Sequence, residues 1–149
     1  MIRDAIAADI PRIGELGHRF FNDAGWCDVA AWCQHSFAAT LARLIETDAA
    51  ILLVAEVDGR VVGMAAGMAY QAYFNAAQLM GSELFWFVEP EHRGRFGTAM
   101  LTAMEARAKA LGCVSWIMGS VPSQKPEAIA RLYARRGYRP AETTFIKGL

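Results

Sequence analysis

A basic, glycine-containing segment in the middle of the chain, EPEHRGRFGTAML (residues 89–101), has residue types that suit the binding of an anion. It joins the apolar run ELFWFV to a helical pattern, and the free N–H groups that begin a helix favour phosphates. Gly94 and Gly97 would let the backbone approach such a ligand closely. Arg93 and Arg95 could add charge-assisted hydrogen bonds. The alternative is a solvated charged loop whose glycines serve only a tight turn.

Two further residues could transfer protons. Tyr133 lies in AIARLYARRGYRP, on a predicted short helix that ends at Gly137, and a tyrosine pKa of about 10 suits proton donation at neutral pH. Glu83 begins the run ELFWFV, where partial burial would raise its pKa towards that of a useful base. Strand alternation places Glu83 on the side of Phe85 and Phe87. The alternatives are a tyrosine packed in the core and a glutamate in solvent or in a structural salt bridge.

The spacing of the remaining polar residues argues against several other kinds of site. The basic segment lacks the Lys-Ser/Thr pair of a P-loop and the sequence context of a Rossmann fingerprint. The three histidines and three cysteines are scattered, so no metal site is predicted. His92 is a candidate for contact with phosphates, although a solvated turn residue has the same pattern. Ser120 has two interpretations in the same way, as a ligand contact or as a turn hydroxyl.

Length and charge bound the class of protein. For 149 residues with 54% hydrophobic and 20% charged side chains, we expect one folded domain over residues 1–149. Lys+Arg and Asp+Glu are both 15, so no global field favours nucleic acid or an anionic membrane. The scattered cysteines, the lack of a signal-peptide pattern and the lack of an apolar run of about 18 residues predict a cytoplasmic protein that spans no membrane.

The pattern of apolar residues predicts an α/β fold of the mixed α+β kind, a mixed sheet with helices on both faces. The order is β-αα-βββ-α-β-α-β, with a hairpin at Asp58-Gly59 and two helices closed by Gly112 and Gly137. The predicted strands cover residues 1–6, 50–57, 60–70, 83–88, 113–118 and 143–149, and the predicted helices cover about 10–25, 29–46, 98–111 and 126–136.

Together, the basic segment and the helix that carries Tyr133 resemble the GCN5-related N-acetyltransferase (GNAT) superfamily. The resemblance rests on ELFWFVEPEHRGRFGTA and LYARRGY, and through the order of elements it extends over nearly the whole chain. It implies a central, mostly antiparallel sheet, and it is nearest to bacterial and phage-type members whose acceptors are generally unassigned. One departure is present. The family spacing would put glycine at Phe96 and Thr98, and a loop shortened by one residue would explain the difference.

The resemblance also implies roles for individual residues. Acetyl-CoA would be the donor, its pyrophosphate on the basic segment and its pantetheine arm between ELFWFV and CVSWIM, which splay apart in the family. Tyr133 would protonate the departing thiolate, and Glu83 would deprotonate the amine directly or through water. The N–H of Val88 or a neighbour would hold the oxyanion. The implied donor-binding residues are Phe87, Val88, Arg93, Gly94, Arg95, Phe96, Gly97, Thr98 and Ala99.

We therefore predict an acetyl-CoA-dependent N-acetyltransferase that acts on a primary amine of a small molecule, peptide or protein. The acceptor site would lie between the two N-terminal helices and residues 70–81, with an aromatic rim of Tyr70, Tyr73, Phe74 and Trp26. These aromatics could equally be core or a dimer contact, and a homodimer is common in the family. Transfer of a longer acyl group, or to a hydroxyl, is a further option.

Two other classes of function are consistent with the same residues. A non-catalytic CoA-binding or regulatory module would keep the basic segment but would not need Tyr133 and Glu83. A toxin-like acetyltransferase would act on aminoacyl-tRNA. The neutral net charge counts against the second class, because tRNA binding usually needs a basic face.

Overall fold

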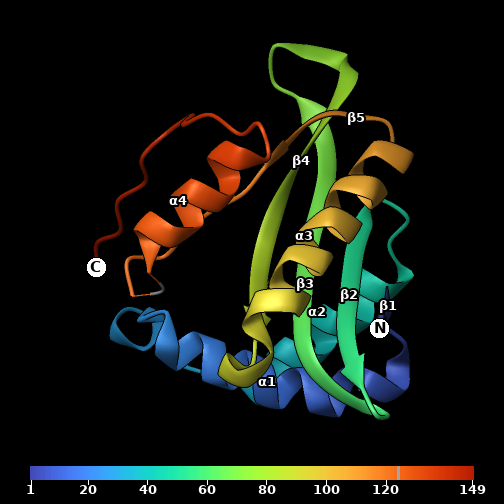
Figure 1. Cartoon of the computed structure of the whole chain (residues 1–149), viewed down its shortest axis with the longest axis vertical. Helices are drawn as coiled ribbons and strands as arrows, with labels where there is room; N and C mark the ends of the chain where they lie inside the picture. The colour runs from blue at the N-terminus through green and yellow to red at the C-terminus, as the bar shows by residue number, and fades with distance from the viewer. Residues whose placement is uncertain (124) are drawn as a thin grey trace.

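The computed structural model describes residues 1–123 and 125–149 and has a five-stranded sheet at its centre (Figure 1). The strands are β1 (Ile2–Asp4), β2 (Ala50–Val57), β3 (Arg60–Ala72), β4 (Asn75–Val88) and β5 (Cys113–Ile117). They lie side by side in sequence order. The first three pairings are antiparallel and the β4–β5 pairing is parallel, which confirms the predicted mixed, mostly antiparallel sheet.

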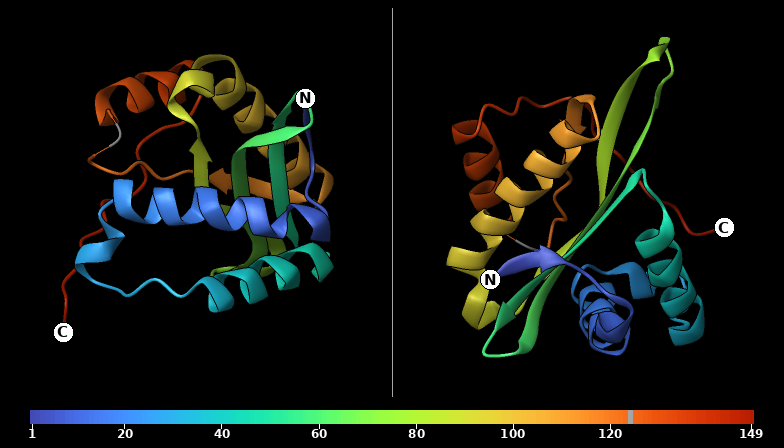
Figure 2. Two further views of the ribbon diagram at one scale, coloured as in Figure 1. Left: turned by 90° about the horizontal axis from the view of Figure 1, so that it is seen from below. Right: turned by 90° about the vertical axis from the view of Figure 1, so that its right-hand side faces the viewer.

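Helices cover both faces of the sheet, as predicted. The helices are α1 (Ile10–Asp23), α2 (Gln34–Glu46), α3 (Arg93–Ala110) and α4 (Pro126–Arg135), with short 3₁₀ turns η1 (Ala7–Asp9), η2 (Trp26–Asp28) and η3 (Pro90–His92). Figure 2 shows α1 and α2 on one face, and α3 and α4 on the other. Each face has its own apolar core, with Leu16 and Leu41 in the first and Met100 and Met104 in the second. None of the described helices is long and apolar enough to cross a membrane.

Local sequence explains the β2–β3 hairpin and the close packing of α1 on α2. The hairpin turns at Asp58 and Gly59, which both have positive φ (49° and 77°), as the favoured two-residue hairpin turn requires. On α1, Gly17 faces α2, and a Cβ at this position would lie 2.3 Å from the Phe37 ring. Any larger residue at Gly17 would push the two helices apart.

Three element boundaries differ from the prediction. Helix α2 begins at Gln34 rather than near residue 29, because the Cys33 sulfur caps it by accepting the Ser36 N–H at 3.5 Å. Strand β4 begins at Asn75 rather than at residue 83. Residues 75–82 lack apolar alternation, but their pairing with β3 makes them part of the strand. Helix α3 begins at Arg93, so much of the basic segment is the first turn and a half of a helix and not an open loop.

The strand predicted at residues 143–149 is absent. In the structure this segment is irregular and pairs with no other described segment. Phe145 is 93% exposed and Ile146 is 64% exposed. Alternating apolar and polar residues favour a strand, but a strand forms only against a neighbour whose backbone groups it can bond. Within the described residues the sheet therefore ends at β5, with five strands instead of six.

Candidate active site

A cleft opens where β4 and β5 part. Their pairing ends at Ser82 and Ile117, after which β4 continues to Val88 while the chain beyond β5 leads towards α4. The cleft has a volume of about 700 Å³ and lies between the end of β4, the start of α3 and helix α4. Eight of the predicted site residues line it: Glu83, Phe87, Val88, Arg93, Gly94, Gly97, Thr98 and Tyr133.

A β-bulge in β4 sets the direction of Glu83. Phe85 and Glu83 pair with successive residues of β3, the latter with Gly67, so Leu84 has no partner on that strand. Paired residues point to the same face of a sheet, and Gly67 faces the Trp116 ring on the α3–α4 side. Glu83 therefore points to the face opposite Phe85, and the prediction that they share a face is wrong. Strict alternation cannot anticipate a bulge, which adds one residue to the strand.

Glu83 and Tyr133 both contact Gly119, which lies just beyond β5. The Glu83 Oε2 atom accepts the Gly119 N–H at 3.0 Å, and the Tyr133 hydroxyl donates to the Gly119 carbonyl at 2.7 Å. Burial raises the pKa of Glu83 to about 7, although the Gly119 N–H opposes this shift. Burial, and then the charge of Glu83, raise the pKa of Tyr133 well above its ordinary value. At neutral pH the cleft thus holds a carboxyl near its titration midpoint beside a protonated phenol.

The end of β4 directs a backbone N–H group into the cleft. The N–H of Glu89 donates to the Val62 carbonyl on β3 at 2.9 Å. Because successive N–H groups of a strand alternate in direction, the N–H of Val88 points away from β3, to the side that β5 has left. The Arg93 Nε donates to the Val88 carbonyl at 3.0 Å, and its guanidinium carbon lies 5.7 Å from the Phe87 ring centre. An N–H donor and a guanidinium therefore share this wall.

The first turns of α3 present two glycines to the cleft. A Cβ added at Gly94 would meet no atom of the described residues within 4 Å. One added at Gly97 would lie 3.6 Å from the Trp86 ring, which is an ordinary van der Waals contact. The packing of the protein itself therefore does not demand glycine at either position. Glycine at both positions leaves the backbone open to the close approach of a ligand.

The predicted donor-binding residues Arg95, Phe96 and Ala99 do not belong to the described lining of the cleft. Phe96 packs into the core, the Arg95 guanidinium lies 5.7 Å from its ring centre, and His92 meets the same ring edge-on. The reason is helical geometry. At about 100° per residue, positions 93, 94, 97 and 98 share one side of α3, while 95, 96 and 99 fall on the other.

The structure adds Lys125 and Arg135, which the sequence did not single out. They lie at the two ends of α4 and line the cleft together with Arg93. These three cations face one carboxylate, Glu83, among the described lining residues, so the cleft favours an anionic ligand. The sequence did contain one indication for Lys125. It precedes Ala128 and Ile129 by three and four residues, and these two belong to the stripe of α4 that lines the cleft.

The four residues of the predicted aromatic rim lie in two separate places in the structure. Trp26 lines the cleft, together with Phe20 of α1. Tyr70, Tyr73 and Phe74 belong instead to the tip of the β3–β4 hairpin, which projects from the top of the molecule in Figure 1. Tyr73 and Phe74 are 86% and 97% exposed and lie outside the described cleft lining. Residues 70–81 are therefore hairpin and strand and not a wall of this cleft.

One group of side chains in the described residues has the composition of a metal site. Glu89, Glu91 and His92 could each place one ligand atom within 4.8 Å of the others. The Glu89 carboxylate, however, already accepts hydrogen bonds from three guanidiniums. Their positive charge disfavours a divalent cation on the same carboxylate.

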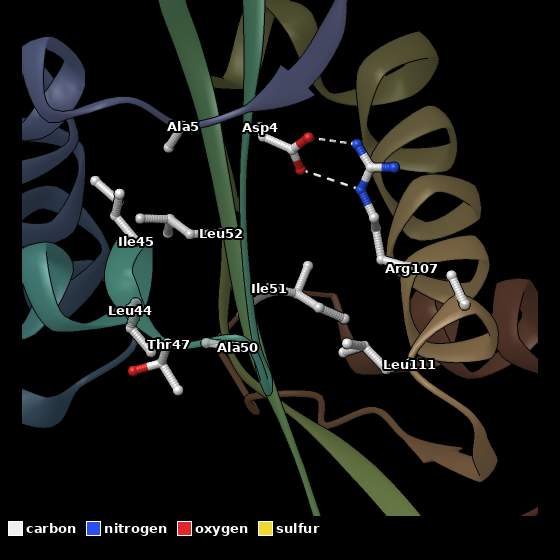
Figure 3. A pocket seen from close by; sticks show the side chains of 11 residues that line it. Asp4, Ala5, Leu44, Ile45, Thr47, Ala50, Ile51, Leu52, Arg107 and Leu111 are labelled. Atoms are coloured by element: carbon white, nitrogen blue, oxygen red, sulfur yellow. Dashed lines mark hydrogen bonds and ion pairs between the residues drawn. The ribbon is translucent and has the colours of Figure 1, made fainter.

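A second, smaller cavity lies at the opposite edge of the sheet, away from Glu83 and Tyr133. It has a volume of about 250 Å³ and apolar walls from α2, β2 and α3, among them Leu44, Ile51 and Leu111. Asp4 and Arg107 meet at its rim, where the Arg107 Nε donates to the Asp4 Oδ1 at 3.1 Å (Figure 3). It contains no acid–base pair like that of the larger cleft among the described residues.

Known proteins share this fold over nearly its full length. A predicted acetyltransferase from Clostridium acetobutylicum, solved with acetyl-CoA, has a TM-score of 0.77 at 17% identity, over 99% of this chain and 95% of that chain. AAC(6')-Iy, solved with the bisubstrate analogue CoA-S-monomethyl-acetylneamine, has a TM-score of 0.78 at 15% identity, over 99% and 95%. An acetyltransferase of Yersinia pestis (strain Pestoides F) is 28% identical over 105 residues, which are 70% of this chain and 68% of that protein.

In this shared fold a parallel strand pair, β4 and β5, opens onto the first turn of α3. The model of the Acetyltransferase (GNAT) family matches residues 17–138. The chain belongs to this family, which confirms the resemblance seen in the sequence.

Proposed function

We propose that the protein is an acetyl-CoA-dependent N-acetyltransferase that moves an acetyl group to a primary amine by direct attack in a ternary complex. The observation that carries this proposal is the shared contact of Glu83 and Tyr133 with Gly119 in the cleft. It supplies a carboxyl that can accept a proton and a phenol that can give one. The likeness to a structure solved with acetyl-CoA supports the choice of donor.

The charges of the cleft fit the donor. The start of α3 brings the positive end of a helix dipole to a pyrophosphate, and Gly94 and Gly97 leave space for it. Arg93, Lys125 and Arg135 add positive charge from both walls. The pantetheine arm would follow the part of β4 that β5 has left, from Val88 towards Glu83.

In the proposed reaction, the ionised Glu83 takes a proton from the acceptor ammonium, directly or through a water molecule. The neutral nitrogen then attacks the carbonyl carbon of the thioester, and the N–H of Val88 holds the oxyanion. The C–S bond breaks with its electron pair on sulfur, and Tyr133 gives the thiolate its proton. The surplus proton on the new amide nitrogen passes to the Tyr133 phenolate, and Glu83 releases the proton that it took to solvent. The products are an N-acetylated amine and CoA, and this chemistry requires no metal ion.

The test begins with the donor. Thermal unfolding is followed with and without acetyl-CoA, with ATP as a control nucleotide. At about 100 times its Kd, a ligand adds roughly 2.7 kcal/mol of stability. A rise with acetyl-CoA and not with ATP supports the donor assignment, and no rise at millimolar acetyl-CoA refutes it. Release of CoA thiol is then measured with a panel of primary amines. Donor binding without thiol release for any amine would favour the non-catalytic module instead.

A further inference from the structure

A buried carboxylate, Glu89, lies where β4 ends and the turn into α3 begins. It is 1% exposed, and its backbone is held on both sides. Its N–H donates to the Val62 carbonyl, and its own carbonyl accepts the His92 N–H, both at 2.9 Å. Its chain neighbours on either side, Val88 and, after η3, Arg93, line the cleft, whereas Glu89 is not among the described lining residues.

Three guanidiniums converge on one oxygen of Glu89. Its Oε1 accepts hydrogen bonds from Arg12 at 2.8 Å, Arg19 at 2.7 Å and Arg60 at 3.0 Å. The other oxygen, Oε2, is buried and has no hydrogen-bond partner among the described residues. A buried carboxylate is tolerated only when it is paired, and this pairing ties α1 and the start of β3 to the end of β4.

The same contacts reach the wall of the cleft. The Arg19 guanidinium, besides bonding Glu89, lies 5.6 Å from the centre of the Phe87 ring. The Arg93 guanidinium lies 5.7 Å from the centre of that ring, and its Nε holds the Val88 carbonyl. A shift of α1 relative to Glu89 would therefore be transmitted to Phe87, Val88 and Arg93 through direct contacts.

We propose that Glu89 and its three arginines are a positioning cluster for the donor site. They hold the Val88 N–H and the first turn of α3 in the geometry that receives the donor, and they fix α1 against that wall. This inference rests on the proposed function, because it assigns the wall to acetyl-CoA. Without the charge of Glu89, the three guanidiniums would repel one another at short range. A cluster that served stability alone would lower the Tm and leave the affinity for the donor unchanged.

The substitution Glu89→Gln tests the charge at nearly constant size. We expect the Kd for CoA, measured by calorimetric titration, and the KM for acetyl-CoA to rise about tenfold or more, because small misplacements at a binding wall are costly. The kcat should fall as well, because the Val88 N–H that would hold the oxyanion belongs to the same wall. Glu105→Gln is the matched control. It removes a different carboxylate, which is only partly buried and is paired with Arg136 and Tyr138, and it should leave the Kd within about twofold.

A pair of arginine variants gives a second readout that does not depend on the folding of Glu89→Gln. Arg19→Gln and Arg60→Gln each remove one donor to the same oxygen, but Arg19 also contacts Phe87. Arg19→Gln should weaken CoA binding more than Arg60→Gln does. Equal Kd values for these two variants, or a folded Glu89→Gln protein with the wild-type Kd, would overturn the inference and leave the proposed function standing. Failure of the wild-type protein to bind CoA would overturn both.

Discussion

Glu83 and Tyr133 are joined through the two peptide groups of Gly119: Glu83 accepts its N–H at 3.0 Å, and Tyr133 donates to its carbonyl at 2.7 Å. In the proposed reaction they act at the two ends of the transfer, as base for the amine and as acid for the thiolate. Because both contacts are to backbone, either side chain can be replaced without removing the anchor of the other. Single variants of this pair are therefore informative.

Tyr133→Phe should slow acetyl transfer strongly. The variant removes the hydroxyl that would protonate the thiolate, and general acid catalysis commonly contributes about 10²- to 10⁴-fold. The lost hydrogen bond to Gly119 should cost only about 1 kcal/mol of stability. The assay is CoA thiol release at saturating acetyl-CoA, with the Kd for CoA measured in parallel.

Tyr138→Phe is the matched control for this variant. Tyr138 lies 5.3 Å from Tyr133 between ring centres, but its hydroxyl donates to Glu105 at 2.9 Å. It is not among the described lining residues of the cleft. The rate of CoA thiol release by the Tyr138→Phe variant should stay near that of the wild type. If Tyr133→Phe also turns over at the wild-type rate, Tyr133 is a packing residue and another group protonates the thiolate.

Glu83→Gln should change the pH dependence of the rate. Because the pKa of Glu83 is raised to about 7, the wild-type kcat should rise as the carboxyl ionises, with a midpoint near that pH. The amide cannot ionise, so in the variant this rise should disappear and the rate should fall at all pH values. The profile is measured from pH 5.5 to 9 with saturating substrates, in steps of about half a unit. A variant whose pH–rate profile keeps a midpoint near 7 would show that Glu83 is not the base and has a structural role.

The same carboxyl should affect stability with a definite sign. The folded-state pKa of about 7 lies above the ordinary value of 4.5, so the folded protein binds this proton more tightly than the unfolded chain does. The contribution is fully present at low pH, and the free energy of unfolding declines as the pH rises from about 4.5 to about 7. Glu83→Gln lacks this decline. Its Tm relative to wild type should therefore increase across that window, and parallel Tm curves would contradict the raised pKa.

Much of the fold could be predicted because its signals are local. The turn Asp58-Gly59, the apolar runs of β2 and β3 and the stripe of α3 each depend on a few neighbouring residues. The position of Tyr133 followed in the same way from the periodicity of α4 and from the family motif. Tyr133 lines the cleft because that stripe packs against the apolar core on the α3 side of the sheet.

The features that could not be predicted depend on contacts between residues that are distant in the sequence. The bulge at Leu84 arises from the register between β3 and β4, and it alone decides which face Glu83 occupies. The buried cluster of Glu89 draws arginines from 29 to 77 positions away, a spacing that no motif encodes. The segment 143–149 has strand periodicity, yet its state depends on whether a neighbouring edge accepts it.

Arg93→Gln should weaken donor binding, whereas Arg95→Gln should not. Both variants remove one positive charge from the start of α3, so they change the general field equally. Only Arg93 lines the cleft, and a hydrogen bond to a charged group is worth about 1.5–3 kcal/mol, which corresponds to a Kd for CoA raised about tenfold or more. Equal weakening by the two variants would show that only the field matters and would contradict the division of α3 into a side that lines the cleft and a side that does not.

Gly97→Ala should stabilise the free protein and weaken the donor complex. Position 97 lies inside α3, where alanine is favoured over glycine by about 1 kcal/mol, and the new Cβ would make an ordinary contact at 3.6 Å with Trp86. The Tm without ligand should therefore rise by roughly 2–4 °C. The methyl group would stand where the donor approaches the backbone, so the further rise in Tm on adding acetyl-CoA should be smaller than in the wild type.

Gly112→Ala is the control. Gly112 has a φ of +87° at the end of α3, so this change should lower the Tm and leave the acetyl-CoA shift intact. An unchanged acetyl-CoA shift in Gly97→Ala would mean that the donor does not approach this turn.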